Sequence, residues 1–371
     1  MKNYQVAVIN GDGIGPEIMR EGLKVVKAAL KKANAPSFTF TEVDSGAELY
    51  LRTGETFPVV SKKVCDEADA TYLSATGLPD VKLPDGTGVS VAWELRVRHD
   101  LFAAVRPLIL YHEDFCPLKG KKAGGIRFTI VRENSEGLYS SRGAGVKLHD
   151  EVVINAAVFT RKASERIMKL AFDMARRGFG APSDGKKRVT CVDKSNVLAG
   201  MAFSRAIYDE VSQGYPDIEK DYCFVDAMAL MLVQRPEHYN IVVTENMHGD
   251  ILSDLGAGLV GGLGYGPSGN IGANKAMFEP SHGTAPTIAG KNIANPVATI
   301  LSGAMMLEWL GSQHNDPSLA KAAKVIDDAT AQVLAEGKIR TADSGGRATT
   351  SAMGDAIALA VESLDAAELA V

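Results

Sequence analysis

Short apolar runs alternate with amphipathic stretches along this chain, and the alternation predicts its fold class. Runs of the kind found in buried strands occupy residues 6–9, 70–75, 189–192 and 241–244, and side chains alternate between apolar and polar over 38–43. Stretches of helical periodicity separate these segments. Strands that alternate with helices are typical of proteins in which most neighbouring strands run parallel. We therefore expect an α/β fold with a largely parallel sheet.

Further elements are predicted in the middle and the last third of the chain. Residues 152–159 have the pattern of a strand, and a helix is expected from about 161 to 177. A long apolar helix should begin at Asn295-Pro296, and the residues after it are mainly helical.

A glycine-rich turn follows the first predicted strand and precedes a helix that should start near Pro16. Its sequence, Asn-Gly-Asp-Gly-Ile-Gly-Pro-Glu at 10–17, has a superficial similarity to a dinucleotide-binding fingerprint. The glycines are spaced G-x-G-x-G, so the third comes too early for G-x-G-x-x-G. Asp12 would in addition oppose a pyrophosphate. Spacing and charge together exclude the ordinary Rossmann fold.

Composition limits the kinds of partner that the protein could have. The 371 residues suffice for two domains, and 46% hydrophobic residues, 23% charged residues and a net charge of −5 are ordinary for a globular protein. We therefore expect neither nucleic acid nor a membrane as a partner, and no apolar run has the length of a membrane span. The N-terminal residues lack a signal-peptide core, and the four cysteines show no C-x-x-C spacing. These features favour a cytoplasmic location with free thiols.

Two acidic residues share one face of the helix that is predicted to open with Gly249. Asp250 and Asp254 are four residues apart, so their carboxylates should lie one above the other. Such a pair repels unless a positive charge lies between them, and a hard cation such as Mg²⁺ would satisfy it. The alternative from this spacing alone is a solvated acidic face.

Other candidate groups lie at the ends of predicted strands. Lys194 and Asn196 lie at the end of the strand predicted to start at Val189, and Asp226 stands where a helix begins. Arg96, Arg106 and Arg132 could bind carboxylates or phosphates in a bidentate manner, although a lone arginine is usually a surface residue.

Taken in order, the motifs of this chain resemble those of the isocitrate/3-isopropylmalate dehydrogenase family. These are the metal-dependent, β-decarboxylating dehydrogenases of 2-hydroxy acids, which include the isocitrate, homoisocitrate, 3-isopropylmalate and tartrate/D-malate enzymes. The resemblance rests on GDGIGPE at 11–17, VRENSEGLY at 131–139, DKSN at 193–196, VDAMA at 225–229, GDILSD at 249–254 and FEPSHGTAPTIAGKNIANP at 278–296. It extends over essentially the whole chain.

The resemblance implies a domain organisation and an assembly. The fold would be isopropylmalate dehydrogenase-like, with two domains and a large mixed, mostly parallel sheet. The cofactor-binding domain would comprise residues 1–104 and 262–371, and the substrate and dimerisation domain residues 105–261. An arm near 143–160 would reach the other subunit of a homodimer with shared active sites, a tetramer being the alternative assembly.

The family also implies roles for the candidate residues. Arg96, Arg106 and Arg132 would clamp the carboxylates of the substrate. Metal ligands for Mg²⁺ or Mn²⁺ would be Asp226, Asp250 and Asp254, with K⁺ as a further candidate ion. Lys194 would take the hydroxyl proton and Tyr139 would reprotonate C3. Lys194 and Asp226, itself counted among the catalytic residues, would come from the other subunit.

By the same resemblance, one segment and one earlier residue would bind NAD or NADP. The implied cofactor-binding residues are Ile14, Glu279, His282, Gly283, Thr284, Ala285, Thr287, Ile288 and Asn295. NAD enzymes of the family have an aspartate after the Ala-Pro pair, and NADP-dependent isocitrate enzymes have Lys-Tyr. This chain has Thr287-Ile288. Isoleucine follows the NAD pattern and threonine follows neither, so NAD is expected and NADP is the alternative.

The residues just before Arg96 bear on the choice of substrate. Ser90 fits an isocitrate enzyme, but Ala92 stands where such an enzyme has asparagine, and a bulky Trp93 would favour a short substrate. We therefore predict oxidative decarboxylation of a malate-type (2R)-hydroxy-dicarboxylate, namely D-malate, tartrate or 3-isopropylmalate. One alternative is an isocitrate or homoisocitrate dehydrogenase. The other is a non-catalytic subunit of a heteromeric isocitrate dehydrogenase, which the presence of Tyr139, Lys194 and the three aspartates disfavours.

Overall fold

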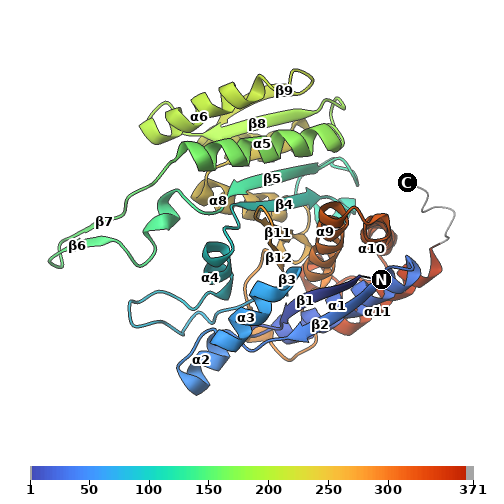
Figure 1. The fold of residues 1–371 in the computed structure, drawn as a ribbon. Coiled ribbons are helices and arrows are strands. Elements are labelled where there is room, and N and C mark those ends of the chain that lie inside the picture. Colours follow the sequence, from blue (N-terminus) through green and yellow to red (C-terminus); the bar gives the residue numbers. More distant parts are fainter. Residues whose placement is uncertain (1, 365–371) are drawn as a thin grey trace. The chain divides into compact units, whose positions relative to one another are not determined.

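The computed structural model describes residues 2–364, which divide into two compact units (Figure 1). The first unit is built from the described residues of Met1–His99 and Gly261–Val371, and the second from Asp100–Val260. The predicted boundaries lie at 104/105 and 261/262. The first boundary falls earlier because the segment after His99 leads directly into a strand that pairs within the second unit.

The first unit contains a set of five strands in the order β2-β1-β3-β12-β11. Neighbours from β2 to β12 run parallel, and β11 is antiparallel to β12. The apolar run at 6–9 lies in the interior strand β1, and its side chains are buried. The five strands are β1 (Asn3–Ile9), β2 (Ser37–Glu42), β3 (Ala70–Leu73), β11 (Pro267–Ile271) and β12 (Ala276–Pro280).

Helices pack on this strand set. Helix α9 is buried on most sides, which explains why its sequence is apolar almost all round. It packs against α1 and α10, and α1 also packs against α11. The helices of the first unit are α1 (Gly15–Lys32), α2 (Ala47–Thr53), α3 (Val59–Glu67), α4 (Val91–Arg98), α9 (Val297–His314), α10 (Pro317–Glu336) and α11 (Thr350–Ser363).

The glycine turn after β1 shows why the ordinary dinucleotide fingerprint does not apply. The Asp12 carboxylate is buried and accepts hydrogen bonds from the backbone N–H groups of Ala47, Glu48 and Gly77. Gly11 has a φ of +73°, and a Cβ atom there would lie 2.0 Å from the carbonyl oxygen of Ala75. Asp12 therefore connects this turn to the start of α2 and to the loop at Gly77, and α1 begins at Gly15 with a proline in its first turn, as predicted.

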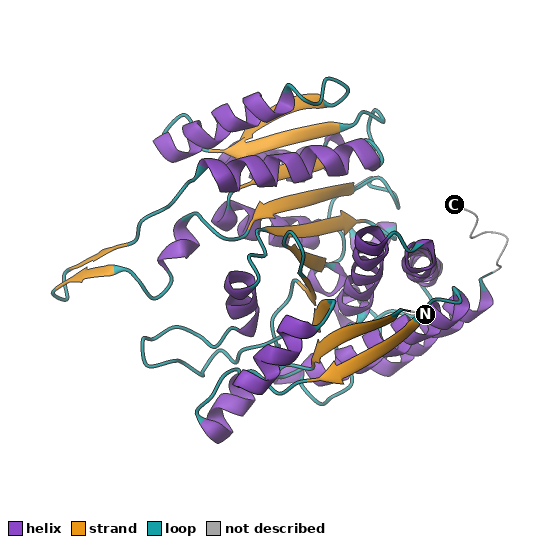
Figure 2. Ribbon diagram, viewed as in Figure 1, coloured by secondary structure: helices purple, strands orange, loops and turns teal. Residues whose placement is uncertain are grey.

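The second unit has its own five strands in the order β4-β5-β10-β8-β9 (Figure 2). Strands β4 and β5 are antiparallel, and the other neighbours are parallel. The elements are β4 (Ala103–Ile109), β5 (Arg127–Glu133), β8 (Arg188–Asp193), β9 (Glu219–Phe224), β10 (Ile241–Thr244), α5 (Arg161–Arg177), α6 (Ala199–Ser212), α7 (Val225–Gln234) and α8 (Asn246–Leu259). Both strand sets are mixed and mostly parallel, and the expected α/β class is confirmed.

A small hairpin projects from the rest of the second unit (Figure 1). It consists of β6 (Val146–Leu148) and β7 (Val152–Ile154), which pair only with each other. The sequence analysis expected one strand over 152–159, which is wrong in its extent. The regular strand ends at Ile154, and Val158 forms an isolated bridge with Gly137 instead of pairing with β6. In residues 2–364, no helix is long and apolar enough to cross a membrane.

Candidate active site

Helix α8 in the second unit presents the two aspartates that the sequence placed on one face. The helix follows strand β10, and the Glu245 carboxylate caps its first backbone N–H groups. Nη1 of Arg106 lies 3.4 Å from Oδ1 of Asp250 and 3.8 Å from Oδ1 of Asp254. Because one guanidinium nitrogen is near both carboxylates, the two acids are neighbours on the same helix face.

Arg132 is held against the same helix. Its guanidinium is 2% exposed, pairs with Asp250 through Nη1, and donates to Oδ1 of Asn246 through Nε at 2.9 Å and Nη2 at 2.8 Å. A Cβ atom at Gly249 would lie 2.6 Å from Cγ of Arg132. The glycine of the GDILSD motif therefore lets α8 approach the arginine closely enough for Asp250 to meet it.

Tyr139 adds a proton donor to this group. Its hydroxyl donates to Oδ2 of Asp250 at 3.1 Å, and the guanidinium of Arg132 lies 5.6 Å from the centre of its ring. Burial, and next the negative charge of Asp250, raise the pKa of Tyr139. The tyrosine therefore keeps its proton at neutral pH. Two arginines, one tyrosine and one carboxylate thus form a site suited to binding a small anion and giving it a proton.

Lys194 and Asp226 form a second pair in the same unit. Lys194 follows β8, Asp226 lies in the first turn of α7, and Nζ pairs with Oδ1 of Asp226. The hydrogen bond from Lys194 lowers the pKa of Asp226. Within residues 2–364, no three or more His, Cys, Asp or Glu side chains are grouped so that they could hold a metal ion. The structure therefore brings Asp250 and Asp254 together in one chain but does not add Asp226 to them.

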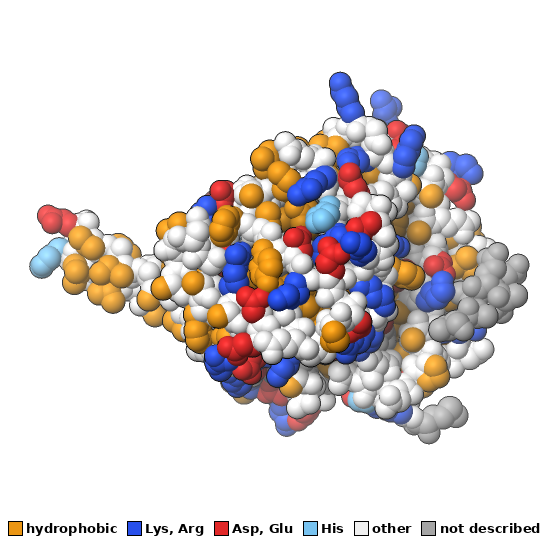
Figure 3. All heavy atoms as spheres, turned by 90° about the horizontal axis from the view of Figure 1, so that it is seen from above, with side chains coloured by type: hydrophobic (Ala, Val, Ile, Leu, Met, Phe, Trp, Pro, Cys, Tyr) orange, Lys and Arg blue, Asp and Glu red, His pale blue; other side chains and the backbone are white. Residues whose placement is uncertain are grey.

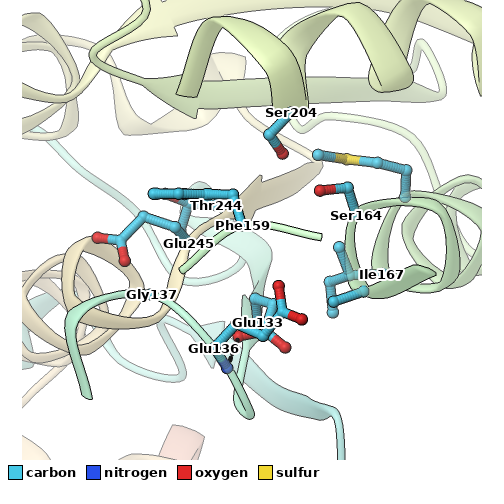
Figure 4. Close-up of a pocket in the computed structure, with 11 residues that line it drawn as sticks. Glu133, Glu136, Gly137, Phe159, Ser164, Ile167, Ser204, Thr244 and Glu245 are labelled. Atoms are coloured by element: carbon cyan, nitrogen blue, oxygen red, sulfur yellow. Dashed lines mark hydrogen bonds between the residues drawn. The ribbon is translucent and has the colours of Figure 1, made fainter. Parts of the chain in front are cut away.

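A small cavity of mixed polar and apolar lining lies beside the turn that contains Glu136 and Gly137 (Figure 4). Its volume of about 20 Å³ has room for one water molecule. Glu133 lines it, and its carboxylate accepts hydrogen bonds from the N–H groups of Ser135 and Glu136 and from the Ser135 hydroxyl. Burial raises the pKa of Glu133. Glu136 in turn accepts from the backbone and side chain of Thr160. These contacts fix the turn that carries the chain from Arg132 to Tyr139.

Several supporting residues were not singled out by the sequence analysis. Asn246 is fully buried beneath Arg132, and the Ser253 hydroxyl accepts a hydrogen bond from Nη1 of Arg106. The sequence contains a feature that could have pointed to each of them. Ser253 lies inside the quoted GDILSD motif, and Asn246 lies two residues after the end of a buried strand. Glu133 also lies inside a quoted motif, but its role depends on a turn that only the structure shows.

In the first unit, Arg96 lies near the end of α4. Its Nε donates to Oδ1 of Asn270 at 2.9 Å and its Nη2 donates to Oε1 of Glu279 at 3.0 Å. The Ser90 hydroxyl caps α4 by accepting from the N–H of Trp93 at 3.3 Å. Trp93 is half-buried and precedes Arg96 by three residues, so the two lie close together on the helix surface. Glu279, expected to bind the cofactor, makes its observed side-chain contacts with Arg96 and Asn270.

A pocket of about 340 Å³ in the first unit gathers most of the residues expected to bind the cofactor. Among them, Ile14 and Ile288 belong to one small apolar cluster. Burial lowers the pKa of His282, which keeps its ring neutral at pH 7. The lining residues are Ile14, Leu263, Gly264, His282, Gly283, Ala285, Ile288, Ile293, Ala294, Asn295, Ala342 and Asp343.

Three of the expected cofactor residues do not line this pocket. Thr284 is buried and donates to the carbonyl oxygen of Gly77, and Thr287 is exposed. Glu279 faces Arg96, as described above. Asp343 is an unexpected lining residue, and Nδ2 of Asn295 donates to its carboxylate at 3.0 Å. Asp343 was not among the residues that the family resemblance implied for cofactor binding.

These features define a class of protein. In open α/β folds small ligands bind at the carboxyl ends of strands and in apolar pockets that contain a few polar groups, and both kinds of place are present in this chain. The sequence profile of the isocitrate/isopropylmalate dehydrogenase family matches residues 5–357. The chain belongs to this family, and it is a decarboxylating dehydrogenase of hydroxy acids.

Individual relatives support the same assignment. The chain is 39% identical to the decarboxylating D-malate dehydrogenase of Escherichia coli, over 96% of this chain and 98% of that protein. It is 40% identical to an isocitrate/homoisocitrate dehydrogenase of Thermus thermophilus, over 97% and 99%. The crystal structure of isocitrate dehydrogenase from Methylococcus capsulatus superposes with a TM-score of 0.84 at 34% identity, covering 97% and 99% of the two chains. Relatives of such similar identity act on different acids, so identity alone does not select the substrate.

Proposed function

We propose that this enzyme is an NAD-dependent and divalent-metal-dependent dehydrogenase that converts a malate-type (2R)-hydroxy-dicarboxylate to a 2-oxo acid and CO₂. The observation that carries the proposal is the convergence of Arg106, Arg132 and Tyr139 on the carboxylate of Asp250. At this place the two arginines can bind an anion, the carboxylate can bind a cation, and the protonated tyrosine can donate a proton.

Asp250 and Asp254 fit a hard divalent cation. Both offer carboxylate oxygens close to one nitrogen of Arg106. Burial raises the pKa of Asp254, although the positive charge of Arg106 acts in the opposite direction. The negative charge of Asp250 adds to that rise, which is the repulsion a cation would relieve. When bound, Mg²⁺ or Mn²⁺ supplies a Lewis acid that stabilises negative charge on substrate oxygens. Asp226 of a second copy would complete the ligand set.

The chain's own residues then handle the substrate and its protons. Arg106 and Arg132 would bind the carboxylate that leaves as CO₂, and Arg96 would bind the other end of the dicarboxylate. Lys194 would take the proton of the 2-hydroxyl during oxidation at C2, for which NAD, when bound, would supply the hydride acceptor. Tyr139 would protonate C3 after CO₂ has left, and its raised pKa keeps the required proton on its oxygen at neutral pH.

A short substrate is favoured by the surroundings of Arg96. Trp93 occupies space near Arg96 on α4, where a larger C3 substituent would have to fit. Ala92 offers no polar group, and the Ser90 hydroxyl is engaged as the cap of the helix. A third carboxylate would therefore find few partners here, which favours D-malate or tartrate. Isocitrate or homoisocitrate is the alternative substrate.

The apolar pocket favours NAD. Among the described residues, its lining includes the carboxylate of Asp343 and neither a lysine nor an arginine. A 2′-phosphate would meet a negative charge without a compensating cation, whereas an adenosine with free ribose hydroxyls fits the mixture of apolar groups and one acceptor. NADP is the alternative cofactor.

A homodimer with shared active sites is supported by exposed apolar side chains on the second unit. The hairpin carries Val146, Leu148, Val152, Val153 and Ile154, all largely exposed, and it is the projecting feature at the left of Figure 3. Helices α7 and α8 add the exposed side chains of Leu230, Val233 and Ile251. Such surfaces are usually covered by a partner. A tetramer is the alternative assembly.

A substrate and cofactor panel tests the proposal. Initial rates would be measured for D-malate, tartrate, 3-isopropylmalate and isocitrate with NAD and NADP, in Mn²⁺ or Mg²⁺ and with KCl or NaCl. We expect the highest kcat/KM for D-malate with NAD. A higher value for isocitrate would overturn the substrate choice, and a preference for NADP would overturn the cofactor choice.

A further inference from the structure

Asn270 lies on β11 of the first unit. Its side chain is 0% exposed. Oδ1 accepts a hydrogen bond from Nε of Arg96 at 2.9 Å, and Nδ2 donates to Oε1 of Glu279 at 2.8 Å. The same Glu279 oxygen accepts from Nη2 of Arg96 at 3.0 Å. Three buried or nearly buried side chains therefore close a ring of hydrogen bonds.

Strand register places two members of this ring side by side. Strands β11 and β12 are antiparallel, with Ser268 opposite Glu279 and Asn270 opposite Met277. Ser268 and Asn270 are two residues apart and project from the same face, so Asn270 and Glu279 are diagonal neighbours. Two sheet residues with restricted backbones thus meet Arg96, which comes from a separate helix.

The ring decides which side of the guanidinium remains available. An arginine has five N–H donors in a rigid plane, and here Nε and one hydrogen of Nη2 are engaged. Within residues 2–364, the hydrogen bonds of Arg96 leave from Nε and Nη2 and none leaves from Nη1. The Nη1–Nη2 edge is therefore the one that can form a bidentate pair with a carboxylate.

We propose that Asn270 is a positioning residue that, together with Glu279, orients Arg96 so that its Nη1–Nη2 edge binds a substrate carboxylate. This inference rests on the proposed function of Arg96 as a substrate-binding residue. Without the Asn270 acceptor, the guanidinium would be held at Nη2 alone and could turn about its side-chain bonds. Ordering Arg96 would then reduce the net free energy of substrate binding.

Asn270→Ala tests the proposal, and Ser268→Ala is its matched control. Ser268 is equally buried, lies on the same strand and face, and is not among the hydrogen-bond partners of Arg96 within residues 2–364. We expect Asn270→Ala to raise the KM for D-malate by about 10-fold or more, since a hydrogen bond to a charged group is lost. The kcat and the KM for NAD should change by less than about 3-fold, because binding of the ground and transition states weakens equally. Ser268→Ala should leave all three values unchanged.

A double-mutant cycle with Arg96→Lys separates positioning from a general structural effect. If Asn270 acts through Arg96, the Asn270→Ala substitution should have little further effect on KM in the Arg96→Lys background. An equal rise in both backgrounds would overturn the proposal. Should the alanine variant fail to fold, Asn270→Ser, whose hydroxyl is too short to reach Nε, gives the same comparison.

The same cycle distinguishes a failure of this inference from a failure of the proposed function. An unchanged KM for Arg96→Lys would show that Arg96 does not bind the substrate, and both proposals for it would fall. A raised KM for Arg96→Lys with an unchanged KM for Asn270→Ala would overturn only the positioning role.

Discussion

The hydroxyl of Tyr139 donates a hydrogen bond of 3.1 Å to Oδ2 of Asp250, and Oδ1 of the same carboxylate pairs with Arg132. Asp250, an expected metal ligand, therefore contacts both the expected proton donor and an expected substrate-binding arginine. Because one side chain joins all three, its replacement should affect catalysis, cation binding and stability together.

Asp250→Asn should lower both activity and stability. Arg132 would lose its charged partner while it remains buried. We expect a loss of about 1–3 kcal/mol, since solvent around the partly exposed carboxylate reduces the ~3–5 kcal/mol typical of a fully buried pair. The kcat should fall at least ~100-fold. Thermal unfolding measures the loss of stability, and calorimetric titration with Mn²⁺ measures the loss of cation binding. Asp254→Asn, whose contact with Arg106 is longer, should abolish Mn²⁺ binding with a smaller loss of stability.

Tyr139→Phe removes the proton donor and leaves the ring in place. We expect kcat to fall by about 100- to 10,000-fold, the range for loss of a general acid. Binding of NAD and Mn²⁺, measured by fluorescence and calorimetry, should be retained because the arginines and aspartates are unchanged. A variant with nearly full turnover would remove Tyr139 from the mechanism.

Shared active sites can be tested by mixing two inactive variants. Lys194→Ala and Tyr139→Phe subunits would be dissociated, mixed and reassembled. If Lys194 serves the site of its partner, each hybrid dimer contains one intact site, and random mixing should restore about a quarter of the native activity. No recovery after demonstrated subunit exchange would mean that both residues serve the same site.

Gly249→Ala and Gly258→Ala compare two glycines of the same helix. A Cβ at Gly249 would lie 2.6 Å from Cγ of Arg132, whereas nothing lies within 4 Å of the corresponding position at Gly258. We expect Gly249→Ala to destabilise the protein by about 1–3 kcal/mol and to reduce activity by displacing Arg132. Gly258→Ala should be neutral or stabilising by up to about 1 kcal/mol. Similar effects of both changes would show that the close approach at Arg132 is unimportant.

Asp66 should contribute to the pH dependence of stability. Its hydrogen bonds from Arg98, and to a lesser extent from His99, lower the pKa of Asp66 in the folded state. A lowered pKa stabilises the fold above the unfolded value of about 3.9, and this stabilisation disappears as the pH falls toward the folded value. Asp66→Asn should therefore lower Tm at pH 7 and reduce the loss of Tm between pH 5 and 3. A Tm difference that stays constant over this range would argue against the ion pair.

Local spacing in the sequence was sufficient for several parts of the fold and site. The four-residue interval between Asp250 and Asp254 placed both on one helix face, and the Gly-Pro pair at 15–16 marked the start of α1. The strand expected at 152–159 was wrong in its extent, because an apolar run does not reveal that its side chains are exposed on a hairpin. Local periodicity cannot distinguish a buried strand from one that projects into solvent.

By itself, the sequence determined the α/β class, the order of the motifs and the identity of Tyr139, Lys194, the aspartates and the arginines as candidate site residues. Three relationships were decided only by the tertiary structure. Arg132 donates a hydrogen bond to Asn246, and Asp343 lines the apolar pocket. Asn270 and Glu279 accept hydrogen bonds from Arg96. The reason is physical. Helical and strand periods fix which neighbours in the chain share a face, whereas contacts between distant segments depend on strand register and packing, which no local pattern records.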